Sequence, residues 1–349
     1  MNDANNSPPL KIKSRTLNWL LKNLFNTWYN SLLTVLCVCV IFIFGKNFLF
    51  WAFTQAQWTV VTTNLRLFLV GRYPADLIWR IWIILGIIIA LFILTWGVLT
   101  KPFLSQITSW LPLLWTLSFP IIMWLIAGGF GLTPVSSDLW TGLLLTLLLA
   151  TVSIALSFPL GILLALGRQS DLPIVRIFSI IYIELIRGLP LIGILFMAQV
   201  MLPLFLPSDL RLDRVVRAIA GLTLFSAAYM AENVRGGLQA IPRGQKEAAK
   251  ALGLNPVLIT SLIVLPQALK VAIPSIVGQF IGLFKDTSLL SIFALLELTG
   301  IARSILAQPE FLGKYAEVYL FVGVIYWVFC YSMSLASRRL EKQLGVGQR

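Results

Sequence analysis

The sequence contains no histidine, and only 12% of its residues are charged. An average soluble domain carries about 25% charged residues, so a soluble fold is disfavoured. Without histidine, the chain cannot use a histidine general base, a histidine-ligated zinc ion or a histidine-ligated haem. Its three cysteines, Cys37, Cys39 and Cys330, lie inside apolar runs, where free cysteine acts as a small hydrophobic residue. No redox chemistry follows from them.

Nucleotide-binding and hydrolase signatures are also missing. The sequence has no G-x-x-x-x-G-K-[ST] phosphate-binding loop, so we expect no ATP hydrolysis by this chain itself. It also has no G-x-S-x-G nucleophile motif and no C-x-x-C pair. The sequence therefore predicts a protein that is not an enzyme, with no cofactor and no metal site.

Long apolar runs dominate instead. The chain is 58% hydrophobic with a mean hydropathy of +0.88, and a membrane span needs about 20 apolar residues. Five uncharged stretches and three charge-interrupted ones qualify: 23–45, 81–100, 102–137, 139–167 and 318–337, then 177–208, 218–233 and 271–296. If 102–137 is one helix plus a loop, the sequence predicts an all-α polytopic membrane protein with about eight transmembrane helices.

The net charge of +13 suggests membrane topology rather than nucleic-acid binding. When the N-terminus is placed in the cytoplasm, most lysines and arginines fall in cytoplasmic segments, although Arg211, Arg214 and Arg217 weaken the bias. The first 30 residues are too long and polar for the start of a secretory signal, so we expect the first span to be retained. Both termini are then predicted to be cytoplasmic.

The chain divides near residue 138, where the loop GLTPVSSD (131–138) is rich in turn formers. Residues 1–138 are predicted to hold an N-terminal cytoplasmic segment and three accessory helices, and residues 139–349 a five-helix core. No inverted repeat, which many secondary transporters show, is visible.

Within this core lies a charged, alanine-rich stretch, EAAKALGLNP (247–256). Pro242 is suited to open a helix that runs through Leu252, with Gly253 as the left-handed residue after it. Asn255-Pro256 is a typical helix start, and Pro266 is predicted to disrupt the second helix. We therefore expect two short helices joined by a glycine elbow.

The first of these helices is predicted to offer a small apolar face to another protein. Ala248, Ala249 and Leu252 would form the face, and Glu247 with two lysines, Lys246 and Lys250, would surround it with charge. A solvated cytoplasmic loop made of good helix formers explains the same residues equally well on physical grounds.

The pattern E-A-A-x-x-x-G-x9-I-x-L-P is complete from Glu247 to Pro266. It resembles the EAA loop of permease subunits of binding-protein-dependent ABC importers. The resemblance implies a type I importer core over 139–349, with a cytoplasmic loop at about 241–266 that docks into a cytoplasmic ABC ATPase dimer. Its coupling residues would be Glu247, Ala248, Ala249, Leu252 and Gly253.

Shorter stretches resemble narrower branches of that family. Residues 141–143, 183–191, 228–232, 241–245 and 285–289 are similar to permeases for polar amino acids. Residues 202–207, 301–303, 326–330 and 344–347 are similar to the M-type permease of general L-amino acid transporters. The resemblance implies a bacterial inner-membrane protein that imports an L-amino acid. It implies a second, Q-type or similar permease and an extracytoplasmic amino-acid-binding protein as partners, and no nucleic acid.

Six polar residues of the core are candidates for the substrate pathway, because a charge in mid-bilayer costs about 2.5–3.5 kcal/mol and needs a reason. They are Glu184, Arg187, Glu232, Lys285, Asp286 and Thr287. An amino acid carries both an ammonium and a carboxylate, and this set offers both signs. Each has a structural alternative: Glu184 can pair with Arg187 and Glu232 with Arg235, each three residues apart on a helix. A secondary transporter, a channel and a non-transporting membrane scaffold remain as alternative functions.

Overall fold

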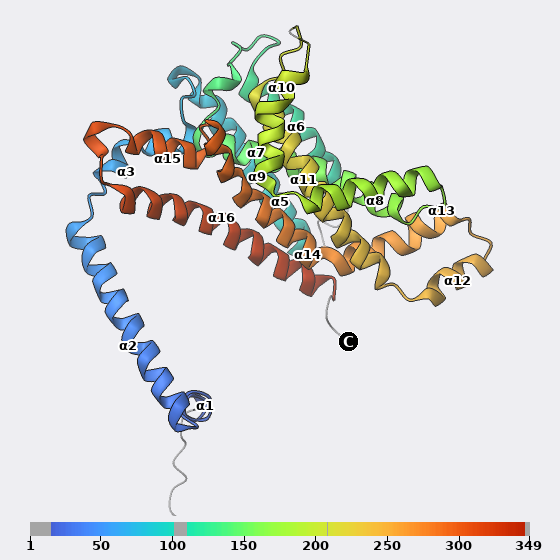
Figure 1. Cartoon of the computed structure of the whole chain (residues 1–349), viewed down its shortest axis with the longest axis horizontal. Coiled ribbons are helices and arrows are strands. Elements are labelled where there is room, and N and C mark those ends of the chain that lie inside the picture. The colour runs from blue at the N-terminus through green and yellow to red at the C-terminus, as the bar shows by residue number, and fades with distance from the viewer. Residues whose placement is uncertain (1–14, 101–109, 208, 346–349) are drawn as a thin grey trace, which may run out of the picture. The chain divides into compact units, whose positions relative to one another are not determined.

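The computed structural model describes residues 15–100, 110–207 and 209–345, which are almost entirely helical and include no β-strand (Figure 1). The contacts divide the chain into two compact units, Met1–Trp58 and Thr59–Arg349. The all-α class predicted from the sequence is confirmed.

The first unit is built around one long apolar helix. Helix α1 (Arg15–Leu24) precedes α2 (Trp28–Phe50), which continues into a π-helical turn, Trp51–Gln55. Thr27 caps α2 through its hydroxyl, which accepts a hydrogen bond from the Asn30 N–H at 3.4 Å. No residue of α2 is buried within the structure, and apolar side chains cover all its sides. A helix that is hydrophobic all round is suited to a membrane span.

The second unit is a bundle centred on α7 (Gly142–Arg168) and α11 (Arg214–Gln239), with α14 (Leu265–Asp286) packed on α11 and on α16 (Tyr315–Gln343). The remaining helices are α3 (Thr59–Thr63), α4 (Leu65–Val70), α5 (Ile78–Thr100), α6 (Leu111–Ala127), α8 (Pro173–Gly188), α9 (Leu191–Phe196), α10 (Leu202–Phe205), α12 (Arg243–Ala251), α13 (Pro256–Leu258) and α15 (Leu298–Leu306).

The predicted membrane spans correspond to helices of the structure. Six helices of the described residues are long and apolar enough to cross a membrane: Trp28–Gln55, Ala75–Thr95, Gly142–Arg168, Arg214–Gln239, Pro256–Phe293 and Tyr315–Gln343. A seventh span is available if α8 and Leu191–Phe205, which meet at 104°, act as one broken span. Helix α6 is a shorter apolar helix. These eight segments match the eight stretches identified in the sequence.

Small residues let the central helices approach closely. A Cβ added to Gly161 of α7 would lie 2.5 Å from the Cβ of Met230 on α11, and one added to Gly237 would lie 2.3 Å from the Ala268 carbonyl oxygen on α14. Helix association in membranes depends on such close packing, because lipid supplies no hydrophobic driving force between helices. These glycines therefore fix the spacing of α7, α11 and α14.

The start of α7 is held by a second close contact. Gly71 and Gly142 both have positive φ, +61° and +68°, and an added Cβ at either would overlap the other segment's backbone. The Arg72 N–H donates to Thr141 Oγ1 at 2.7 Å, and the Gly142 N–H donates to the Leu296 carbonyl at 2.8 Å. Helices α3 and α4 thus pack onto α7, α15 and α16. The functional boundary predicted near residue 138 stays a prediction.

Candidate functional site

The stretch EAAKALGLNP forms the expected elbow between two helices. Helix α12 starts at Arg243, with Pro242 as its N-cap, and ends at Ala251, with Leu252 as its C-cap, so each end is one residue inside the predicted limits. Gly253 has a φ of +78°, the left-handed conformation that the sequence predicted. The Gly253 N–H donates to the Lys250 carbonyl at 2.9 Å, which closes the last turn.

The second helix differs from the prediction. The side chain of Asn255 caps α13, accepting from the Leu258 N–H at 2.9 Å, but α13 is followed at once by a π-helical turn, Ile259–Val264, and then by α14. Pro266 does not disrupt this helical path. It lies in the first turn of α14, where its missing N–H and its ring are accommodated by the wider turn before it. The predicted disruption at Pro266 is wrong.

The exposed face of α12 also differs from the prediction. Leu252 is 82% exposed, and Glu247 and Ala248 are exposed beside it. Ala249 is only 2% exposed, because it packs into a hydrophobic core cluster of this chain that includes Ile259. Ala249 therefore anchors α12 to its own chain, and the prediction that it belongs to an outward apolar face is wrong. Leu252 is the apolar side chain that stands out into solvent.

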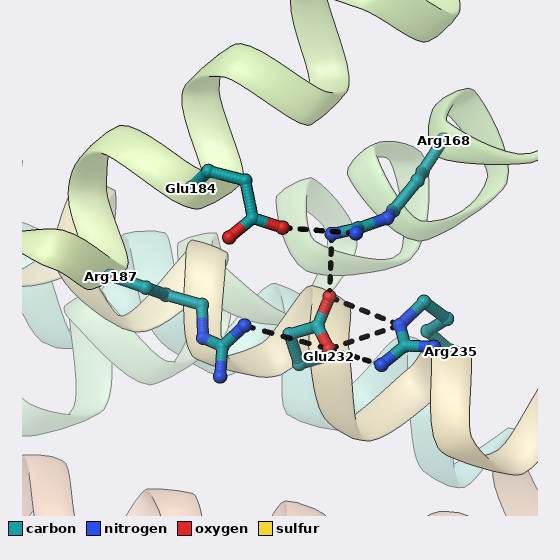
Figure 2. Close-up of polar contacts among 5 residues, drawn as sticks. All are labelled: Arg168, Glu184, Arg187, Glu232 and Arg235. Carbon is teal, nitrogen blue, oxygen red and sulfur yellow. Dashed lines mark hydrogen bonds and ion pairs between the residues drawn. The ribbon is translucent and has the colours of Figure 1, made fainter.

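Five charged residues form a connected cluster around Glu232 of α11 (Figure 2). The Glu232 carboxylate accepts from Arg235 at 2.6 Å and from Arg168 at 2.9 Å, and lies 3.6 Å from Arg187. Arg168 also contacts Glu184 at 2.9 Å. Three guanidinium groups thus face two carboxylates, which leaves a net charge of +1. We call these five residues the Glu232 cluster.

The pairing within the Glu232 cluster is partly as predicted. The Glu232–Arg235 contact is confirmed. The predicted pair of Glu184 with Arg187 is wrong. Glu184 instead pairs with Arg168, the last residue of α7, and Arg187 pairs with Glu232. Arg187 also lies over the ring of Tyr229, 5.6 Å from its centroid. The cluster therefore joins α7, α8 and α11 immediately before the 104° bend that follows α8.

The other three predicted pathway residues lie at the far end of α14. Lys285 is exposed, Asp286 is half-buried, and Thr287 is buried with its hydroxyl donating to the Phe284 carbonyl at 2.7 Å. Helix α14 begins at Leu265, directly after the EAA loop, and ends at Asp286, whereas Glu232 lies beside the middle of α14, where the Asn233 amide donates to the Ser275 carbonyl at 3.3 Å. The structure thus divides the six candidates into two groups.

Sequence reasoning missed Glu297, which caps α15. Its side chain is fully buried and accepts hydrogen bonds from the Thr299 N–H (2.9 Å), the Gly300 N–H (2.8 Å) and the Tyr326 hydroxyl (3.2 Å). Burial raises the pKa of the Glu297 carboxyl to about 7, against the lowering effect of the two backbone N–H groups. An acid directly before a helix start is the available sequence signal. Glu297 ties α15 to α16 at the end of the bundle opposite the EAA loop.

The bundle of apolar helices and the exposed loop that interrupts it define a multi-pass membrane protein. Residues 157–346 match the family model described as "Binding-protein-dependent transport system inner membrane component". The chain belongs to this family. It is a permease subunit in the inner membrane, a transport component rather than an enzyme.

Similar proteins span nearly the whole chain. It is 43% identical over 353 residues to the inner membrane amino-acid ABC transporter permease protein YhdY of Escherichia coli K12, covering 96% of this chain and 95% of that one. It is 39% identical to the glutamate/glutamine/aspartate/asparagine transport system permease protein BztC of Rhodobacter capsulatus, covering 83% and 79%. Among solved structures, an amino acid ABC transporter with histidines matches with a TM-score of 0.53 and 29% identity, covering 58% of this chain and 92% of the other.

Proposed function

We propose that this permease imports L-amino acids and is driven by a separate cytoplasmic ATPase dimer that docks on the EAA loop. The observation that carries the proposal is the loop itself, which presents Leu252 and Glu247 to solvent on a helix anchored by Ala249. Burying one exposed leucine in a partner contributes about 1.5–3 kcal/mol. The similarity to permeases named for amino-acid transport supports the substrate class.

The path from the ATPase to the membrane runs through α13 and the π-helical turn into α14. When the ATPase closes, it would move α12, and the continuous helical path Pro256–Phe293 would carry that movement into the bundle. ATP binding on the cytoplasmic side and a loaded binding protein on the outer side would each favour one of two arrangements of the transmembrane helices. The difference between each ligand's binding free energies for the two arrangements then drives the switch.

Within the bundle, the Glu232 cluster and the group Lys285, Asp286 and Thr287 are the proposed contacts for a zwitterionic substrate. The cluster offers cations for a carboxylate, and Asp286 offers an acid for an ammonium group. Because one group lies beside the middle of α14 and the other at its end, they would meet the substrate at successive points of one pathway rather than together. The second permease subunit, of the Q type or similar, would complete that pathway, as the M-type resemblance of this chain suggests.

We test this function by purifying the intact complex from membranes and by measuring uptake. The expected result is co-purification of an ATPase and a second permease, together with ATP-dependent uptake of an amino acid that needs a binding protein. We expect Asp286→Asn to lower uptake while the complex still assembles, since the change keeps size and shape. Uptake driven by an ion gradient without any ATPase would support a secondary transporter instead. Ion conductance would support a channel. The absence of any transport would support a membrane scaffold.

The orientation of the chain gives a separate prediction. Both termini are proposed to be cytoplasmic; residues 1–14 and 346–349 lie outside the described residues. A reporter fused after Arg349 should therefore label the cytoplasm, and one inserted between residues 59 and 75 should label the outside, because an odd number of spans separates them. Labelling of both reporters on one side would contradict the span count.

A further inference from the structure

A small polar pocket of 160 Å³ opens at the end of the bundle opposite the EAA loop. It forms where the starts of α7 and α11 meet the segment before α15. Its polar lining comes from Arg72, Ser137, Asp138, Thr141 and Arg214, with Trp140 among its apolar residues.

The walls of this pocket are fixed by hydrogen bonds between chain segments. Arg72 is held through its backbone N–H by Thr141, which leaves its exposed guanidinium available. Arg214 donates to the Phe293 carbonyl at 2.7 Å, and its own carbonyl accepts from Gln199 at 2.9 Å. No ion pair of Arg72 or Arg214 occurs among the described residues. The Arg214 guanidinium is thus positioned in advance, which lowers the entropy lost when a ligand binds, and Arg72 adds a second cation beside it.

We propose that this pocket receives a carboxylate side chain from the extracytoplasmic binding protein, with Arg72 and Arg214 as its donors. The proposal rests on the proposed function. A carboxylate accepts several hydrogen bonds and pairs with arginine in a planar, two-point geometry. Asp138 lines the same pocket, and its carboxylate repels further negative charge. The pocket therefore suits a ligand with one carboxylate and not a multiply charged anion.

The size of the pocket favours a side chain over a whole free ligand. Pockets that enclose small molecules usually measure about 300–1,000 Å³, whereas this one has 160 Å³, the space of about five waters at roughly 30 Å³ each. The family depends on a binding protein, which must deliver its cargo at the outer face, where the proposed topology places this pocket. A protruding acidic side chain from that partner has the matching size and charge.

The test measures binding of the loaded amino-acid-binding protein to the complete importer in lipid nanodiscs. We expect Arg72→Glu to raise the dissociation rate of the binding protein at least tenfold, while basal ATPase activity stays unchanged. The matched control is Arg211→Glu, which reverses the same charge at an exposed site outside the pocket. It should alter the association rate and its salt dependence but leave the dissociation rate within twofold, since rim charges act mainly on association.

An unchanged dissociation rate in Arg72→Glu would overturn the proposal while leaving the proposed function intact. So would stimulation of the wild-type ATPase by free L-glutamate without binding protein, if Arg72→Glu abolished it and the dissociation rate were unaltered. That result would assign the pocket to a free ligand. A wild-type importer that bound no binding protein at all would contradict the proposed function as well.

Discussion

Replacing Gly253 with proline is expected to abolish both uptake and co-purification of the ATPase, while the permease remains in the membrane. Gly253 has a φ of +78°, and proline is confined to about −65°, so the elbow between α12 and α13 cannot form. The rest of the bundle is unaffected, because a side chain at this position would meet no atom within 4 Å. Membrane content, ATPase recovery on the tagged permease and uptake are the three measurements.

A graded series separates backbone conformation from side-chain volume. Gly253→Asn should retain most activity, because asparagine tolerates the left-handed region, and Gly253→Ala should be intermediate, with a cost of about 1–2 kcal/mol. The matched control is Gly244→Ala in α12, where the added Cβ also meets open space but φ is not positive. Wild-type uptake in Gly253→Pro would remove the coupling role from this loop.

The surface beside the elbow is tested by Leu252→Asp and by Glu247→Arg. Both side chains are exposed, so neither change disturbs the fold of the permease. Each places an unfavourable charge where we propose that the ATPase docks, and loss of ATPase recovery is the expected result in both.

Replacing Glu232 with glutamine is expected to have the second large effect. The change removes the carboxylate that three arginines share and leaves their positive charges facing one another around a side chain that is 15% exposed. Breaking a buried pair by removing one partner costs about 3–5 kcal/mol, and the partial exposure of the arginines places this site toward the lower end. We expect uptake to fall by at least tenfold.

Assembly and basal ATPase activity of the Glu232→Gln complex distinguish a substrate-binding role of the Glu232 cluster from a structural one. If it contacts substrate, the complex should assemble with normal basal ATPase activity while transport falls. If it only joins α7, α8 and α11, the complex itself should be lost from the membrane. The control is Glu184→Gln, because Glu184 is 55% exposed and, among the described residues, forms an ion pair with Arg168 alone, and exposed pairs contribute about 0–1 kcal/mol. An equal effect of both changes would rule out a special role for Glu232.

The sequence predicted the helices and the elbow because both depend on local properties. Span length follows from runs of apolar residues, and the turn at Gly253 follows from glycine's access to positive φ. The ion-pair partners of Glu184 and Arg187 depend instead on how α8 packs against the end of α7. The spacing of residues along one helix gives no information on that packing. The burial of Ala249 likewise depends on the return of Ile259, ten residues later, onto the same core.

Glu297 illustrates a different limit. Its role becomes visible only when Leu298 is known to begin a helix and Tyr326, on a later helix, is known to lie within 3.2 Å of the carboxylate. An acid before a helix start indicates a cap, but it does not show that the side chain is buried. Its contacts with Thr299 and Gly300 are local, but its burial comes from long-range packing.

The contact of Gly71 with Thr141 has a consequence for protein engineering. The family model begins at residue 157, which invites a minimal permease made by deleting everything before the five-helix core. Yet Gly142 has a positive φ and its neighbours are shaped to the backbone of residues 67–71, while the Tyr73 hydroxyl donates to the Ile126 carbonyl at 3.0 Å. A truncation at residue 138 would leave a start of α7 fitted to a surface that no longer exists. A truncation before Thr59, where the contacts of the chain divide, would keep this surface intact.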